Sequence, residues 1–249
     1  MTKLNFNDTQ TAFAYKSNRD LIRDYQIFRL INQSWLVKIG TRTASGLMNA
    51  GIKAPIAFGM RPTIYATFCG GDTLQLATKK IDQLYKYKVQ SVLDYGVEGK
   101  EEEEDFIRTA NAIKEAILFA KNNNAVDIVC SKFTGLIPFA ILEKMHDEAA
   151  LTDEENAILE KAKERIYSLA QLAYDNNVSL FVDAEESWIQ HPLDDLTFDL
   201  MSKFNKQKPI IYNTLQFYRR DRLHFFKNVV NNAKQAGFIY AAKLVRGAY

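Results

Sequence analysis

The sequence predicts an α/β protein, a (β/α)8 TIM-type barrel of which this chain carries about five strands, preceded by a helical N-terminal segment. Beyond residue 88, short runs rich in β-branched residues alternate with longer amphipathic stretches, as in parallel strands joined by helices. A polar side chain stands at the carboxyl end of every run, where such barrels hold their chemistry. An open doubly wound sheet would need polar residues only beside one crevice, so the barrel is favoured.

Residues 1–88 are predicted to be a helical segment separate from the barrel units. Ser17 can cap a single helix whose apolar residues recur with helical spacing; they are Leu21, Ile22, Tyr25, Phe28, Ile31 and Trp35. Residues 44–58 contain glycines and Pro55, which favour a short helix and a loop over one long helix. Residues 73–87 again have the apolar spacing of a helix.

Residues 89–249 are predicted to be the first five β/α units of the barrel. The strand-like runs are residues 89–95, 125–133, 178–183, 209–217 and 238–245. The helices between them are expected at residues 101–122, 137–145, 152–176, 193–204 and 220–236. The sequence TDEE at Thr152 is a capping box that opens the longest of these helices. Gly237 suits the position just after the last one.

The length of the chain does not suffice for a whole barrel of this type. Eight β/α units need roughly 250 residues, whereas the helical segment already takes 88 of the 249 residues here. The chain stops at the mouth of the fifth strand, which would leave an open parallel edge. We therefore expect this sequence to be the N-terminal part of a longer protein.

The composition excludes several classes of protein. Hydrophobic residues make up 47% and charged residues 25%, as in ordinary globular proteins. The net charge of +2 gives no sign of a nucleic-acid partner. Two distant cysteines and three histidines offer few zinc ligands, so no metal site is expected. The polar N-terminus lacks the features of a signal or transit peptide, which predicts a cytoplasmic protein.

Polar residues at successive strand ends form a candidate site. They are Asp94, Lys132, Asp183, Gln216, and Arg246 with Tyr249. An ammonium at the end of an apolar strand is costly to bury alone, and Asp183 could be the anionic partner of Lys132. A purely structural ion pair therefore stays open beside two functional roles for Lys132, which are binding a substrate carboxylate and forming a Schiff base.

The last two strand ends suit a cofactor. Gln216 carries an amide that can both donate and accept, a fitting partner for the edge of a heterocycle. Lys243, Arg246 and the small pair Gly247-Ala248 form a cationic loop that allows close approach. Such a loop suits a phosphate or an anionic ring.

Several short strings resemble segments of the proline dehydrogenase family. They are KLVRGAY at residues 243–249, NTLQFY at 213–218, FVDAE at 181–185 with Gln190 following, SKFT at 131–134, LDY at 93–95 and FCGGD at 68–72. The strings run in the family's order from about residue 60 to the last residue. They are most similar to the monofunctional, mitochondrial-type branch.

The resemblance implies a flavoenzyme that oxidises L-proline to Δ1-pyrroline-5-carboxylate. A hydride would pass from proline C5 to N5 of FAD, and the electrons would then go to a membrane quinone. The resemblance also implies a peripheral membrane contact, on the inner face of the membrane, and a mitochondrial location if the source is eukaryotic.

The resemblance also assigns roles to individual residues. Lys132 would contact the proline carboxylate, Asp183 would organise the cationic site, and Tyr249 would pack on the proline ring. The residues assigned to the flavin are Gln216, Lys243, Arg246, Gly247 and Ala248.

Two other interpretations remain open. The first is a Schiff-base aldolase that uses Lys132 on a barrel strand and needs no flavin. The second is a non-catalytic fragment or interaction module formed by the helical segment.

Overall fold

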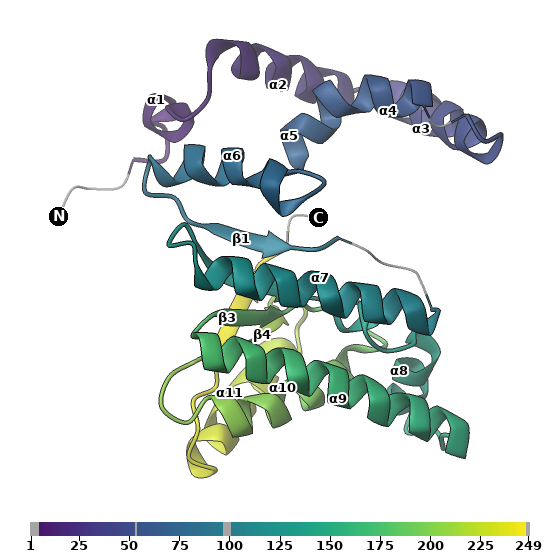
Figure 1. Ribbon diagram of the computed structural model, residues 1–249, viewed down its shortest axis with the longest axis vertical. Helices are drawn as coiled ribbons and strands as arrows, with labels where there is room; N and C mark the ends of the chain where they lie inside the picture. The colour runs from purple at the N-terminus through teal and green to yellow at the C-terminus, as the bar shows by residue number, and fades with distance from the viewer. Residues whose placement is uncertain (1–4, 53, 97–100, 248–249) are drawn as a thin grey trace. The chain divides into compact units, whose positions relative to one another are not determined.

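The computed structural model describes residues 5–52, 54–96 and 101–247 of the chain (Figure 1). The chain forms two compact units, Met1–Val89 and Gln90–Tyr249, and each is described by itself. None of the helices in the described parts combines the length and the apolar character needed to cross a bilayer.

The first unit is helical. Its elements are α1 (Thr9–Phe13), α2 (Asn18–Ile31), α3 (Ser34–Asn49), α4 (Ala54–Met60), a π-helical turn (Arg61–Tyr65), α5 (Ala66–Phe68) and α6 (Leu74–Tyr85). Ser17 caps α2 as predicted, and Asp20 completes a reciprocal capping box. Between α3 and α4 the chain turns at Gly51, whose φ of 80° favours glycine.

A buried carboxylate ties α2 to α5 and to the residues just before α2. Asp24 is 6% exposed. It accepts hydrogen bonds from Lys16 Nζ at 2.5 Å and from Thr67 Oγ1 at 2.8 Å, and it also pairs with Arg23. Partial burial acts to raise the pKa of Asp24, but the bonds from Lys16, Thr67 and Arg23 outweigh it and hold that pKa at about 2.

The second unit is a half-barrel of five parallel strands. The strands are β1 (Ser91–Asp94), β2 (Val126–Ser131), β3 (Ser179–Val182), β4 (Ile211–Gln216) and β5 (Ala242–Val245). They lie in the sheet in the order β1-β2-β3-β4-β5, and every pair is parallel. A doubly wound sheet reverses its strand order at a switch point, so this uninterrupted order confirms the barrel architecture.

Helices follow the strands at the predicted places. They are α7 (Glu103–Lys121), α8 (Phe139–His146), α9 (Asp153–Asn176), α10 (Gln190–Phe204) and α11 (Arg222–Gln235), and a 3₁₀ turn lies at Phe133–Gly135. Helix α7 packs on β2, and α7 and α9 lie side by side (Figure 1). The capping box at Thr152 opens α9, and Gly237, with a φ of 71°, follows α11 as predicted.

The core of this unit lies between the sheet and its helices. Completely buried side chains come from both layers, among them Ile117 on α7, Ala173 on α9, Leu193 on α10 and Ile211 on β4. Close packing of this kind holds the strands in fixed positions, so the loops at their carboxyl ends start from a rigid scaffold.

Candidate active site

The register of the sheet places four polar residues in one row. Ser131 pairs with Val182, and Val182 pairs with Asn213, so Lys132, Asp183 and Thr214 stand level with one another. Thr214 in turn pairs with Lys243. Registered neighbours in parallel strands point to the same face. The row therefore gathers two cations, a carboxylate and a hydroxyl at the carboxyl ends of four consecutive strands.

Asp183 is at the centre of this row. Its Oδ1 forms an ion pair with Lys243 Nζ and lies 3.4 Å from Thr214 Oγ1. The side chain of Asp183 is 17% exposed and that of Lys243 is 33% exposed. Sequence reasoning named Lys132 as the partner of Asp183, and that pair stays a prediction. The partner found is Lys243, sixty residues further along the chain.

Cys130 lies beneath the row. Its thiol is free and buried. Burial, followed by the charge of nearby Asp183, raises the pKa of Cys130 to about 12. Cys130 is therefore an inert part of the floor of the site. Asp94 ends β1 and pairs with Cys130, so it lies two residues below the level of Lys132 in the register of the sheet.

Glu185 joins three strand ends; the sequence placed it in the string FVDAE but assigned it no role in the site. Its carboxylate accepts from the hydroxyl of Thr134 and from the Thr134 backbone N–H at 3.2 Å. Its own N–H donates to Gln190 Oε1 at 2.9 Å, and its carbonyl accepts from Gln216 Nε2 at 2.7 Å. Burial raises the pKa of Glu185, although the bonds from Thr134 and the charge of Lys132 oppose this.

Gln216 is buried at the end of β4 with both ends of its amide engaged. Besides the bond to Glu185, its Oε1 lies 3.4 Å from Arg219 Nη1. An amide nitrogen has two hydrogens and an amide oxygen has two lone pairs, so each end keeps one more bonding position. Gln216 therefore fixes the loop after β3 and retains capacity for a ligand.

The backbone of the loop after β5 passes close to a protein side chain, and its close approach to a cofactor stays a prediction. Gly247 has a φ of 93°, and a Cβ built there would lie 2.9 Å from the ring of Tyr218. Arg246, just before it, is exposed. Ala248 and Tyr249 lie outside the described residues. Within the described ranges, no cluster of three or more His, Cys, Asp or Glu side chains is placed to hold a metal ion.

A parallel half-barrel with charged groups at the carboxyl ends of its strands has the architecture of the (β/α) barrel enzymes. Comparison with known proteins shows to which family of barrel proteins the chain belongs. The family model for proline dehydrogenase matches residues 77–249, which is more than two thirds of the chain. The chain therefore belongs to the proline dehydrogenase family, as its motifs indicated.

Named relatives agree with this membership. "Proline dehydrogenase 1, mitochondrial" of Dictyostelium discoideum is 26% identical over 97% of this chain and 49% of its own length. The protein of the same name in Arabidopsis thaliana is 27% identical over 99% of this chain and 58% of its own. "Carbapenem antibiotics biosynthesis protein CarD" of Pectobacterium carotovorum is 30% identical over 75% of this chain and 50% of its own. The chain thus spans about half the length of these relatives.

A solved structure supports the fold. The chain superimposes on proline utilization A from Bdellovibrio bacteriovorus, inactivated by N-propargylglycine, with a TM-score of 0.63. The identity is 19%, and the match covers all of this chain and 27% of the other. At this identity the likeness concerns the fold alone.

Proposed function

We propose that this chain is part of a flavin-dependent proline dehydrogenase, which oxidises L-proline to Δ1-pyrroline-5-carboxylate. The row of Lys132, Asp183, Thr214 and Lys243, called the substrate row from here on, would bind the substrate. The supporting observation is the row in which Lys132, Asp183 and Lys243 alternate in charge at the mouth of the half-barrel. Proline carries a carboxylate and a ring ammonium, so a row with both signs of charge suits it. Membership of the family supports the same reaction.

The chain's own residues would bind and orient the substrate. Lys132 would hold the proline carboxylate, a charge-assisted contact that contributes about 1.5–3 kcal/mol. Asp183 would organise the cations beside it, since its carboxylate already holds Lys243. Tyr249 would cover the apolar part of the proline ring and exclude water.

The residues after β4 and β5 fit an FAD cofactor. The cations Lys243 and Arg246 suit its anionic groups, and Gln216 keeps bonding positions for a heterocycle edge. The positive φ of Gly247 allows a tight backbone path there. The residues proposed for the flavin are Gln216, Lys243, Arg246, Gly247 and Ala248. When bound, FAD supplies the acceptor for the hydride from proline C5.

The test uses the protein at its natural length. We expect the purified protein to carry flavin absorbance that bleaches when L-proline is added under anaerobic conditions. Protein that carries no flavin and does not oxidise proline would overturn the proposal. In that case, borohydride trapping of a carbonyl substrate on Lys132 would support the aldolase interpretation instead.

The electron acceptor in this proposal is a membrane quinone, and the first unit has a surface suited to a bilayer. No acidic residue occurs from residue 25 to residue 71, whereas five lysines and arginines do. Helix α3 exposes Trp35 and Ile39 by 60% and 58%. A cationic helix with exposed aromatic and aliphatic side chains is typical of helices that lie at a membrane surface.

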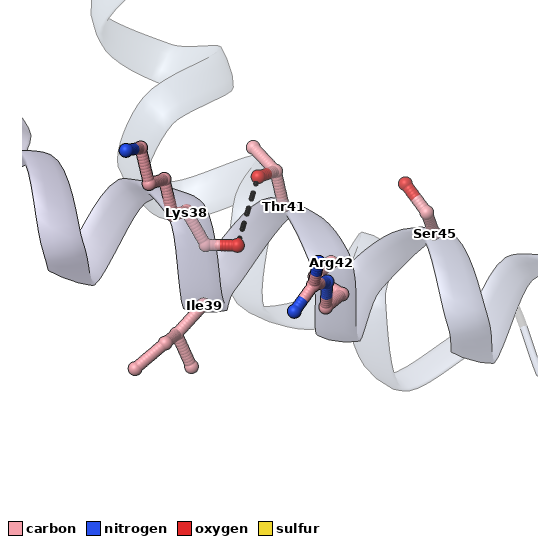
Figure 2. A pocket seen from close by; sticks show the side chains of 5 residues that line it. All are labelled: Lys38, Ile39, Thr41, Arg42 and Ser45. Atoms are coloured by element: carbon pink, nitrogen blue, oxygen red, sulfur yellow. Dashed lines mark hydrogen bonds between the residues drawn. The ribbon is translucent and has the colours of Figure 1, made fainter.

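Helix α3 also lines a pocket that combines basic, aliphatic and hydroxyl side chains (Figure 2). Its lining residues are Lys38, Ile39, Thr41, Arg42 and Ser45. Figure 2 shows Lys38, Thr41 and Ser45 projecting to one side of α3 and Ile39 to the other. Two cations one helical turn apart suit the phosphate of an anionic lipid headgroup, and the hydroxyl of Ser45 lines the same pocket. The hydroxyl of Thr41 donates to backbone carbonyls of the helix. The mitochondrial relatives support a location at a mitochondrial membrane, where such lipids occur.

Vesicle sedimentation tests this contact. We expect the protein to bind vesicles that contain phosphatidylglycerol and to leave pure phosphatidylcholine vesicles unbound. Each basic residue near an anionic surface contributes about 1 kcal/mol, so Lys38→Glu with Arg42→Glu should weaken binding at least about thirty-fold. The matched control changes Lys114 and Lys121 of α7 to glutamate. Equal loss in both double variants would contradict a surface on α3.

A further inference from the structure

Glu185 uses all of its polar groups to bind three different elements. Its carboxylate binds Thr134, its N–H binds Gln190, and its carbonyl binds Gln216. We propose that Glu185 is a positioning residue for the active site. It holds the carboxyl ends of β2, β3 and β4 together, so that Lys132 and Asp183 keep the spacing that the substrate requires. This inference rests on the proposed function.

The bonded residues lie close to the substrate row along the chain. Thr134 follows Lys132 by two residues, and Glu185 follows Asp183 by two residues. The bond between Thr134 and Glu185 therefore joins the two loops just beyond the level at which Lys132 and Asp183 stand beside each other. A displacement of either loop would shift the side chain just below it.

The junction is anchored to a buried polar network behind the sheet. Gln190, which accepts from the Glu185 N–H, donates through Nε2 to Asp194 Oδ1 at 3.0 Å. Asp194 also accepts from Asn213 Nδ2 at 2.8 Å and from Arg222 Nη2 at 2.6 Å. Gln190 and Asp194 are each 2% exposed. Hydrogen bonds in such a low-dielectric setting are strong and mutually supporting, so the loop after β3 is tied to α10, β4 and α11.

The carboxylate of Glu185 acts through other residues and not on the substrate itself. Both of its oxygens accept from Thr134, and its charge interacts with Lys132. Charge and geometry can be separated by substitution. Glu185→Gln removes the charge but keeps polar atoms that can bond Thr134, whereas Glu185→Ala removes the junction.

Steady-state kinetics with proline at the protein's natural length tests the inference. We expect Glu185→Ala to lower kcat/KM for proline about tenfold or more, chiefly by raising KM, with normal flavin content. Thr134→Val, which removes only the hydroxyl, should change KM in the same direction. Glu185→Gln should stay within about threefold of the parent. The control is Glu186→Ala, because Glu186 is the exposed neighbour in the same loop.

Hydrogen exchange supplies a readout that does not depend on activity. In the parent the Thr134 amide, held by Glu185 Oε1, should exchange slowly, and in Glu185→Ala it should exchange at least about tenfold faster. Unchanged kinetics in Glu185→Ala and Thr134→Val would overturn the inference, as would unchanged exchange. Loss of flavin together with a lower melting temperature, without a rise in KM, would indicate a merely structural role and also overturn it. A parent protein that is inactive on proline would instead overturn the proposed function.

Discussion

Replacement of Asp194 by alanine should strongly destabilise the half-barrel, because one carboxylate serves three buried donors. It accepts from Arg222 at 2.6 Å and from the side-chain amides of Asn213 and Gln190. The side chains of Asp194 and Arg222 are only 1% and 5% exposed. Asp194→Ala therefore leaves a buried guanidinium whose remaining ion-pair partner is the exposed carboxylate of Asp221, 3.9 Å away. Breaking a buried pair from one side costs about 3–5 kcal/mol.

A double variant separates the pair from its burial. Asp194→Leu with Arg222→Met removes both charges and restores apolar volume, so it should cost less than Asp194→Ala alone. Urea unfolding followed by circular dichroism gives the free energy of unfolding for each. The control is Asp195→Ala, since the side chain of Asp195 on the same helix is 69% exposed and should matter by about 0.5 kcal/mol or less. The reasoning fails if Asp194→Ala stays within about 1 kcal/mol of the parent, or if the double variant is the less stable.

Three further predictions concern other groups. Lys132→Ala should raise KM for proline roughly ten- to a hundred-fold with normal flavin content, and unchanged proline kinetics would reduce Lys132 to a structural residue. The pKa of Asp24 is held at about 2, below its unfolded value. Its contribution of about 2 kcal/mol should therefore be complete above about pH 4 and disappear as pH falls toward 2. The free energy of unfolding, measured between neutral pH and pH 2, should lack this contribution in Asp24→Asn. Equal stability of parent and variant at neutral pH would refute the prediction. Iodoacetamide with mass spectrometry should label exposed Cys69 and spare Cys130, whose pKa is raised to about 12; rapid labelling of both would refute this.

Local signals in the sequence predicted most of the fold. The caps at Ser17 and Thr152 and the glycine after α11 depend on neighbouring residues, and all three are present. The helical spacing continued past Ile31, but the structure breaks there between α2 and α3. The polar run 32–34 contains the break, because its side chains offer no apolar face to continue the helix.

The site was predictable as a set of strand ends and not as a set of contacts. Lys132, Asp183 and Gln216 were predicted because each is a polar residue at the end of an apolar, strand-like run, a pattern that depends only on sequence neighbours. The pairing of Asp183 with Lys243 depends on register across three strands, which no local pattern records. Glu185 stood in the string FVDAE, but its bonds to Thr134 and Gln216 could not be foreseen for the same reason, because these partners lie 51 and 31 residues away.

The uninterrupted strand order has a consequence for synthesis on the ribosome. In the described half-barrel, each strand from β1 to β4 pairs with the strand that follows it in the sequence. The sheet can therefore grow in the order in which the chain emerges, with none of these strands waiting for a distant partner. The charges of the site cannot assemble so early. Asp183 emerges sixty residues before Lys243, so its carboxylate remains without that ion pair until β5 is added. The nascent protein would thus add these strands stepwise, and the ion pair between Asp183 and Lys243 would form only once the fifth strand has been made.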